Sequence, residues 1–144
     1  MEKYLQQQKT DCIKIVLFGP ESTGKTSLAI DLAKHYKTVY VEEFARDFLQ
    51  KKLDEQNKVC EIDDLIPIAI GQMNSENKLS KKANRILFCD TDLLTTATYS
   101  RLYFDNFKET LIKNHKPFKL ISGNLEERLK KSINFVDEIL LRKT

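Results

Sequence analysis

The sequence predicts an α/β fold in which a parallel β-sheet carries helices on both faces. Short runs rich in apolar and β-branched residues alternate along the chain with longer segments whose apolar residues recur at helical spacing. The first short run, 13–18, contains Lys14 as its single polar residue. Such a run is typical of a strand that is buried on both faces of a parallel sheet.

The expected elements alternate in a regular order. Strands are expected at 13–18, 39–41, 86–89 and 118–121. Helices are expected at 25–36, from 44 to the polar stretch 54–58, at 63–82, 93–103, 107–114 and 125–141. Either Asp63 or Asp64 can cap the third helix, because Pro67 then occupies its first turn, where a missing N–H does no harm.

The composition is that of a soluble globular protein. The chain has 144 residues, enough for one domain, which we place at 12–144 after a flexible polar N-terminus at 1–11. Hydrophobic residues make up 41% and charged residues 31%, and no apolar stretch approaches the ~20 residues of a membrane span. The net charge of +3 is small and the lysines are dispersed, so nothing points to nucleic-acid or membrane binding.

The N-terminus and the cysteines favour a cytoplasmic protein. Residues 1–11 lack the apolar segment of a secretory signal. Cys12, Cys60 and Cys89 are far apart and lack metal-ligand spacing, so we expect reduced thiols in a reducing compartment. The sequence carries no prediction of oligomeric state.

A phosphate-binding loop follows the first expected strand. Gly19 and Gly24 belong to the pattern G-x-x-x-x-G-K-[ST], and a helix is expected directly after it. Glycine turns there aim backbone N–H groups at phosphate oxygens, and the helix adds its positive end. We expect ATP as the ligand, with Lys25 on the β- and γ-phosphates and the Thr26 hydroxyl on Mg²⁺. The predicted contacts are Gly19, Glu21, Ser22, Thr23, Gly24, Lys25, Thr26 and Ser27, and the predicted fold is a three-layer P-loop NTPase fold.

Two acids follow the third strand, at the edge of a parallel sheet where ligands bind. An apolar run that ends in an acid such as Asp90 is the Walker B arrangement, in which the carboxylate holds Mg²⁺. A helix-capping or structural acid is the alternative. Asp92 is a candidate substrate contact and equally a candidate N-cap of the following helix.

The second strand is followed by a further polar group. Glu43 and Asp47 are candidates for orienting or deprotonating a substrate hydroxyl, and a solvated helix start is the alternative. Arg46 suits phosphate or carboxylate recognition, or else pairs with a neighbouring acid. Gln72 can read a polar edge of a substrate, serve as a buried capping residue, or lie at the surface. The predicted catalytic residues are Lys25, Glu43, Asp47 and Asp90.

Together these segments resemble the NadR-like ribosylnicotinamide kinases. The resemblance is carried by 15–26, by Glu-Phe-Ala-Arg-Asp at 43–47, by 68–72 and by Asp-Thr-Asp at 90–92, and it spans roughly 14–103 and 107–140. It implies phosphoryl transfer from ATP to the 5′-hydroxyl of nicotinamide riboside, giving the mononucleotide used in NAD synthesis. It also implies that Glu43, Arg46 and Asp47 lie at the nucleoside site.

The chain departs from this family after Tyr103. Phe104-Asp105-Asn106 stands where the family has a longer stretch with a core strand and an arginine-bearing lid. A lid excludes water and brings positive charge to the transferred group, so we expect either impaired catalysis or an incomplete sequence. An ATP-binding regulatory module without kinase activity is therefore the alternative. A GTPase is not expected, because the sequence has no Asn-Lys-x-Asp segment.

Overall fold

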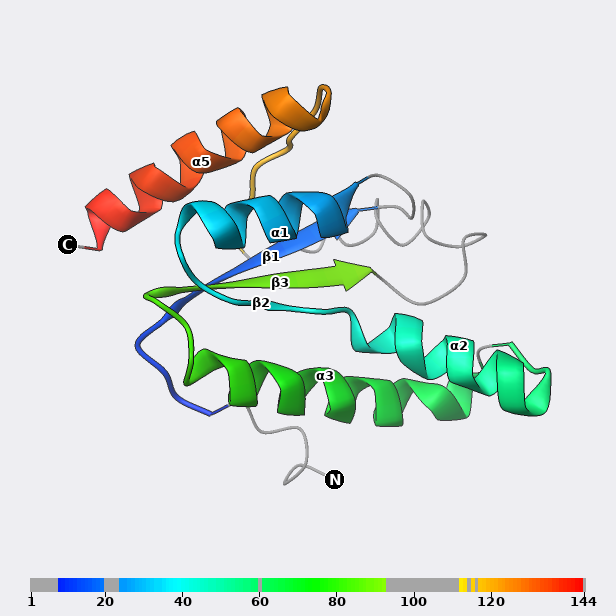
Figure 1. Cartoon of the computed structure of the whole chain (residues 1–144). Helices are drawn as coiled ribbons and strands as arrows, with labels where there is room; N and C mark the ends of the chain where they lie inside the picture. Colours follow the sequence, from blue (N-terminus) through cyan, green and yellow to red (C-terminus); the bar gives the residue numbers. More distant parts are fainter. Residues whose placement is uncertain are drawn as a thin grey trace.

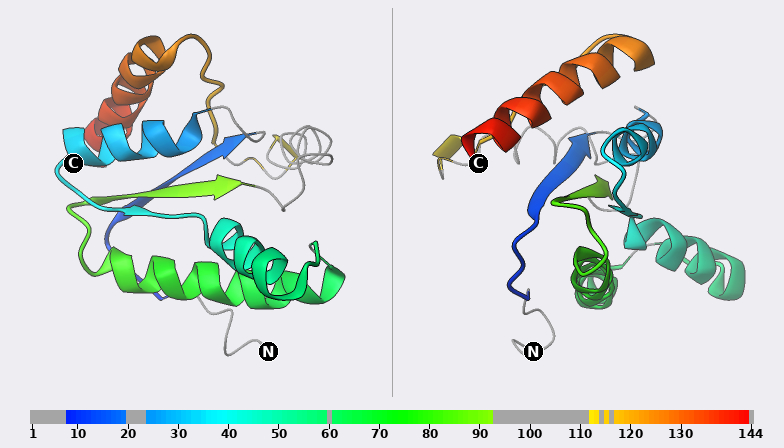
Figure 2. Two further views of the ribbon diagram at one scale, coloured as in Figure 1. Left: turned by 45° about the vertical axis from the view of Figure 1, so that its right-hand side comes forward. Right: turned by 60° about the vertical axis from the view of Figure 1, so that its left-hand side comes forward.

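The computed structural model describes residues 8–19, 24–59, 61–92, 112–113, 115 and 117–143, and it confirms the predicted α/β class. A parallel sheet lies between two layers of helices (Figure 1). Helices α1 (Lys25–His35) and α5 (Leu125–Arg142) lie on one side of the sheet. Helix α3 (Leu65–Ser80), entered through the 3-10 helix η2 (Ile62–Asp64), lies on the other side, with α2 (Phe44–Gln56) against it. The turned views of Figure 2 show the same separation of the two layers.

The sheet brings three strand ends to one edge. Its order among the described residues is β1 (Ile13–Gly19), β3 (Ile86–Asp92) and β2 (Tyr40–Val41), and all pairings are parallel. Gly19 lies opposite Asp92, and Val41 lies opposite Cys89. The residues that follow the strands therefore converge at the carboxyl edge, where ligands bind in open α/β sheets.

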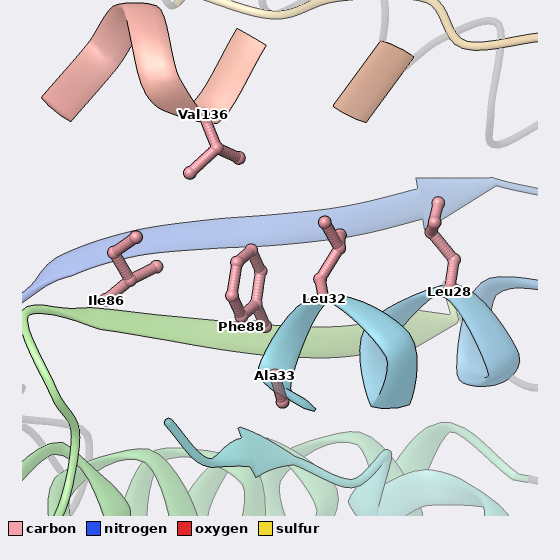
Figure 3. Packing of buried hydrophobic residues seen from close by; sticks show 6 residues of the cluster. All are labelled: Leu28, Leu32, Ala33, Ile86, Phe88 and Val136. Atoms are coloured by element: carbon pink, nitrogen blue, oxygen red, sulfur yellow. The ribbon is translucent and has the colours of Figure 1, made fainter. Parts of the chain in front are cut away.

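The face toward α1 and α5 holds the main apolar core. Alternate residues of β3 point into it, because successive side chains of a strand point to opposite faces. Phe88 and Leu32 are completely buried, and each such side chain contributes about 1.5–3 kcal/mol to stability. Figure 3 shows the cluster from close by; its buried members are Leu28, Leu32, Ala33, Ile86, Phe88 and Val136.

Local sequence explains how the helices next to the site begin and end. Asn124 caps α5, since its side chain accepts a hydrogen bond from the backbone N–H of Glu127. Asn57 ends α2 in a left-handed conformation, which asparagine tolerates better than most residues. No helix in the described part of the chain is long and apolar enough to cross a membrane.

Two expectations about the sheet are wrong. Strand β1 is not buried on both faces, because α3 packs over β2 and β3 and leaves Val16 51% exposed. The run 118–121 forms no strand. A strand needs a neighbour for its backbone groups, and no described strand pairs with this run. The helices expected at 93–103 and over most of 107–114 lie outside the described residues.

Candidate nucleotide and acceptor site

The phosphate loop connects β1 to α1 as expected. Gly24 precedes α1 with a φ of 80°, a left-handed conformation that glycine adopts without strain. The Lys25 ammonium donates a 2.9 Å hydrogen bond to the carbonyl of Gly19, so it reaches back from the start of α1 to the end of β1. Ser27 is exposed in the first turn of α1. Glu21, Ser22 and Thr23 lie outside the described residues.

Thr26 and Asp90 meet although 64 residues separate them in the sequence. The Thr26 hydroxyl donates a 2.5 Å hydrogen bond to Oδ2 of Asp90. Asp90 is 1% exposed, and its Oδ1 has no hydrogen-bond partner among the described residues. A buried carboxylate oxygen without a partner is costly, and hydroxyl and carboxylate oxygens are the ligands that Mg²⁺ prefers. These two residues therefore fit a magnesium ion held beside the phosphates.

Arg46 joins this pair to the acids after β2. Its Nη1 donates to the Thr26 hydroxyl over 3.3 Å, and its Nη2 lies 3.3 Å from Oε2 of Glu43. Glu43 is buried at 8% exposure, whereas about half of the Arg46 side chain remains exposed. Arg46 therefore combines an ion pair to a neighbouring acid with a contact to the phosphate side of the site.

A cavity of about 300 Å³ opens beyond β2, between α2 and α3. Its lining combines acidic groups with aromatic side chains, and ligand sites use such polar groups to orient a ligand and aromatic rings to contact it. The Tyr40 hydroxyl donates to Glu42 over 3.4 Å. Burial and the carboxylate of Glu42 raise the pKa of Tyr40, so its hydroxyl remains protonated at neutral pH. The lining residues are Tyr40, Glu42, Glu43, Phe44, Asp47, Ser75 and Leu79.

The other two predicted substrate residues, Gln72 and Asp92, have different outcomes. Gln72 is not among the residues that line this cavity; its Oε1 accepts a 3.1 Å hydrogen bond from the backbone N–H of Phe44, which is the capping alternative. Asp92 ends β3 opposite Gly19, and its side chain lies outside the described part of the molecule. The structure thus brings Glu43, Arg46 and Asp47 together at the start of α2, whereas Gln72 lies on α3 and contacts the backbone of α2.

Arg128 is a site residue that the sequence pattern does not reveal. A Cβ atom on Gly24 would lie 3.6 Å from both terminal nitrogens of the Arg128 guanidinium and 3.2 Å from Cδ2 of Leu125. Helix α5 therefore packs directly against the end of the phosphate loop and adds positive charge there. Arg128 is one of several basic residues on α5, and nothing in its spacing distinguishes it from Lys130 or Lys131.

Strand β1, the glycine loop and α1, with Thr26 hydrogen-bonded to the buried Asp90, define a nucleotide-binding domain of the P-loop class. A family model described as an AAA domain matches residues 14–128, and the chain belongs to this family. It is also similar to the trifunctional NAD biosynthesis/regulator protein NadR of Salmonella typhimurium and of Escherichia coli. Identity to each is 30% over 89 residues, which cover 62% of this chain and 22% of the relative. The aligned part is thus about a fifth of each relative's length.

Proposed function

We propose that this protein transfers the γ-phosphoryl group of ATP to the 5′-hydroxyl of a small nucleoside, and that nicotinamide riboside is its substrate. The observation that carries the proposal is the position of the acidic cavity. Glu43 lines the cavity and is linked through Arg46 to Thr26, on the magnesium side of the phosphate loop. An acceptor bound in the cavity would therefore adjoin the phosphoryl group that it receives.

The chemistry of the cavity favours a cationic nucleoside. Three carboxylates, those of Glu42, Glu43 and Asp47, line it, and carboxylates accept hydrogen bonds from ribose hydroxyls. Nicotinamide riboside carries a positively charged pyridinium ring, which the acidic lining attracts. The aromatic rings of Tyr40 and Phe44 add surfaces on which a flat cation can rest. The NAD biosynthesis named for the two relatives agrees with this choice.

Each residue then has a role in transfer. Lys25 binds the β- and γ-phosphates, and the magnesium ion held by Thr26 and Asp90 would neutralise phosphate charge. The 5′-hydroxyl oxygen bonds to the γ-phosphorus as the bond to ADP breaks, and its proton passes to a carboxylate. Glu43 suits this task because it is buried and directed toward Arg46, with Asp47 one turn further along α2 as the second candidate. Arg46 stabilises charge on the transferred group.

Transfer from Mg-ATP to a panel of nucleosides tests the proposal. The panel contains nicotinamide riboside, its neutral dihydro form, adenosine, cytidine and uridine, and products are separated by chromatography. The charged and dihydro ribosides have nearly the same shape, so their comparison isolates the charge of the ring. We expect selective formation of nicotinamide mononucleotide. Equal transfer to the two forms would remove the electrostatic argument, and transfer only to other nucleosides would remove the NAD assignment.

The second candidate is an ATP-binding regulatory module that transfers nothing. It is favoured by the short segment after Tyr103 and by the unpaired run 118–121. Calorimetry separates the two functions, since a module of this kind binds ATP and does not bind the nucleoside. ATP binding without nucleoside binding or transfer would replace the kinase proposal with this one.

A further inference from the structure

The first helical residue of α2 is held by α3. A helix leaves the N–H groups of its first turn without partners inside the helix, and the N-cap side chain usually accepts one of them. The N-cap of α2 is Glu43, and its side chain makes no capping hydrogen bond. The Phe44 N–H donates instead to Oε1 of Gln72, which lies 28 residues further along the chain. The capping task therefore falls to another helix, while the carboxylate of Glu43 lies against Arg46.

The ring of Phe44 is fixed by the neighbouring residue of α3. A Cβ atom on Gly71 would lie 2.2 Å from two carbons of this ring, so the ring rests directly on the α3 backbone. Gly71 thus contacts the side chain of Phe44, and Gln72 binds its backbone N–H. That residue lines the cavity, between Glu43 before it and Asp47 one turn after it.

The amide of Gln72 has one orientation that satisfies both of its neighbours. Its Nε2 donates to Oε1 of Glu76 over 3.4 Å, and a carboxylate can only accept. The other carboxylate oxygen of Glu76 lies 3.8 Å from the ammonium of Lys14 on β1, and both side chains are largely buried. If the Gln72 amide were flipped, its oxygen would face the carboxylate oxygen of Glu76, and its NH2 group would face the backbone N–H of Phe44. Neither contact could then form a hydrogen bond. The pair of Lys14 and Glu76 therefore keeps Oε1 of Gln72 directed at α2.

We propose that Gln72, oriented by the ion pair of Glu76 and Lys14, is a positioning residue that sets the placement of Glu43 and Asp47 in the acceptor cavity. The inference rests on the proposed function for its kinetic consequence. Gln72 itself contacts neither the nucleotide nor the acceptor in this proposal. Loss of the Gln72 oxygen is expected to impair use of the acceptor and to leave the use of ATP unchanged, because the phosphate loop is built on β1 and α1.

The test compares the wild-type chain with Gln72→Ala and with Asn74→Ala, a change at an exposed residue of the same helix. Hydrogen exchange at the start of α2 is measured together with kcat and KM for both substrates. In Gln72→Ala we expect the Phe44 amide to exchange roughly fivefold to tenfold faster. The ratio kcat/KM for the nucleoside should fall about tenfold, with KM for ATP unchanged. Asn74→Ala should match the wild type in every measurement.

A double variant separates positioning from general damage to the fold. Q72E/E76Q exchanges the amide and the carboxylate, so the Phe44 N–H again meets an acceptor and the pair can still hydrogen bond to each other. We expect it to recover slow exchange and acceptor use, because a carboxylate at position 72 accepts in either orientation and does not need the ion pair of Glu76 and Lys14. Exchange in Gln72→Ala equal to that in Asn74→Ala, or an equal loss in the use of ATP and nucleoside, would overturn the proposal. A wild type that transfers phosphate to no nucleoside would defeat the proposed function, while the exchange experiment would still decide whether Gln72 holds α2.

Discussion

On the face of the sheet covered by α1 and α5 the buried cluster is apolar, whereas the face covered by α3 encloses the ion pair of Lys14 and Glu76 beside its apolar residues. Apolar burial is non-directional, so the buried cluster of the first face stabilises the fold, and a directional contact of this face lies at its edge, where the Thr26 hydroxyl donates to Asp90. Hydrogen bonds are directional, and on the second face they fix the start of α2. The first face carries the phosphate loop and the second carries the acceptor cavity. Under the proposed function, stability and substrate placement are therefore supplied largely by opposite sides of one sheet.

The largest expected effect tests the apolar face. Phe88 and Cys89 are consecutive, completely buried residues of β3 that belong to different clusters, one on each face. Phe88→Ala should lower the free energy of unfolding by about 3–5 kcal/mol, because it removes a large side chain and leaves a cavity. Cys89→Ala, the control, should cost about 1 kcal/mol. Urea unfolding gives both values, and a loss in Phe88→Ala as small as that in Cys89→Ala would contradict the place of Phe88 in the main apolar core.

The next effect concerns the phosphate loop. Lys25→Ala should reduce phosphoryl transfer by about 10²–10³-fold, because the ammonium group proposed to bind the β- and γ-phosphates is lost. Its unfolding midpoint should stay near that of the wild type. Lys34→Ala, an exposed change in the last turn of the same helix, serves as the control. Steady-state kinetics with Mg-ATP measures the loss, and an unaltered rate would sink the role of Lys25.

A smaller loss is expected on the acceptor side. Glu43→Gln keeps the shape of the side chain and removes the carboxylate that would take the proton, so kcat should fall about 10²-fold. The dissociation constant for ATP should change little, because Arg46 lies between the Glu43 carboxylate and the Thr26 hydroxyl on the phosphate side. Calorimetry gives the affinity and steady-state kinetics gives kcat. Equal losses in ATP affinity and in turnover would show that Glu43 does not act on the acceptor.

The smallest effect is a pH dependence at the entrance to α3. Asp64 accepts hydrogen bonds from the Lys52 ammonium over 2.6 Å and from the Glu61 N–H over 2.7 Å, which lower its pKa from the ordinary value of 3.8. The Asp64 carboxylate thus binds a proton less readily in the folded protein than in the unfolded chain. The stability that Asp64 contributes is therefore present above pH 3.8 and is lost as the pH falls through the lowered pKa. Thermal melts of wild type and Asp64→Asn should differ at pH 7 and converge as the pH falls below 3.8 through the lowered pKa of Asp64. Asp63→Asn, at the exposed neighbouring position, should show no such convergence, and a constant gap for Asp64→Asn would contradict the assignment.

Local sequence patterns were enough to establish the α/β class, the first three strands, and the helices α1, α2, α3 and α5 within a few residues. These depend on periodicity and on a contiguous glycine motif, both readable along the chain. The same patterns placed Thr26 and Asp90 at one edge, because parallel strands bring their carboxyl ends together. They overestimated the burial of β1 and wrongly indicated a strand at 118–121, since both depend on neighbours that no short segment specifies.

Which of the candidate residues act on one another depended on the tertiary structure. Gln72 looked like a possible substrate contact, yet it caps a helix that begins 28 residues earlier. Arg46 was expected to bind phosphate or to pair with an acid, and in the structure it contacts both Glu43 and Thr26. No sequence pattern distinguishes Arg128, and only the packing of α5 against Gly24 puts its guanidinium beside the phosphate loop. The physical reason is the same in each case: a hydrogen bond or close packing contact needs two partners at the right distance, and for partners remote in sequence the packing of the helices on the sheet sets that distance.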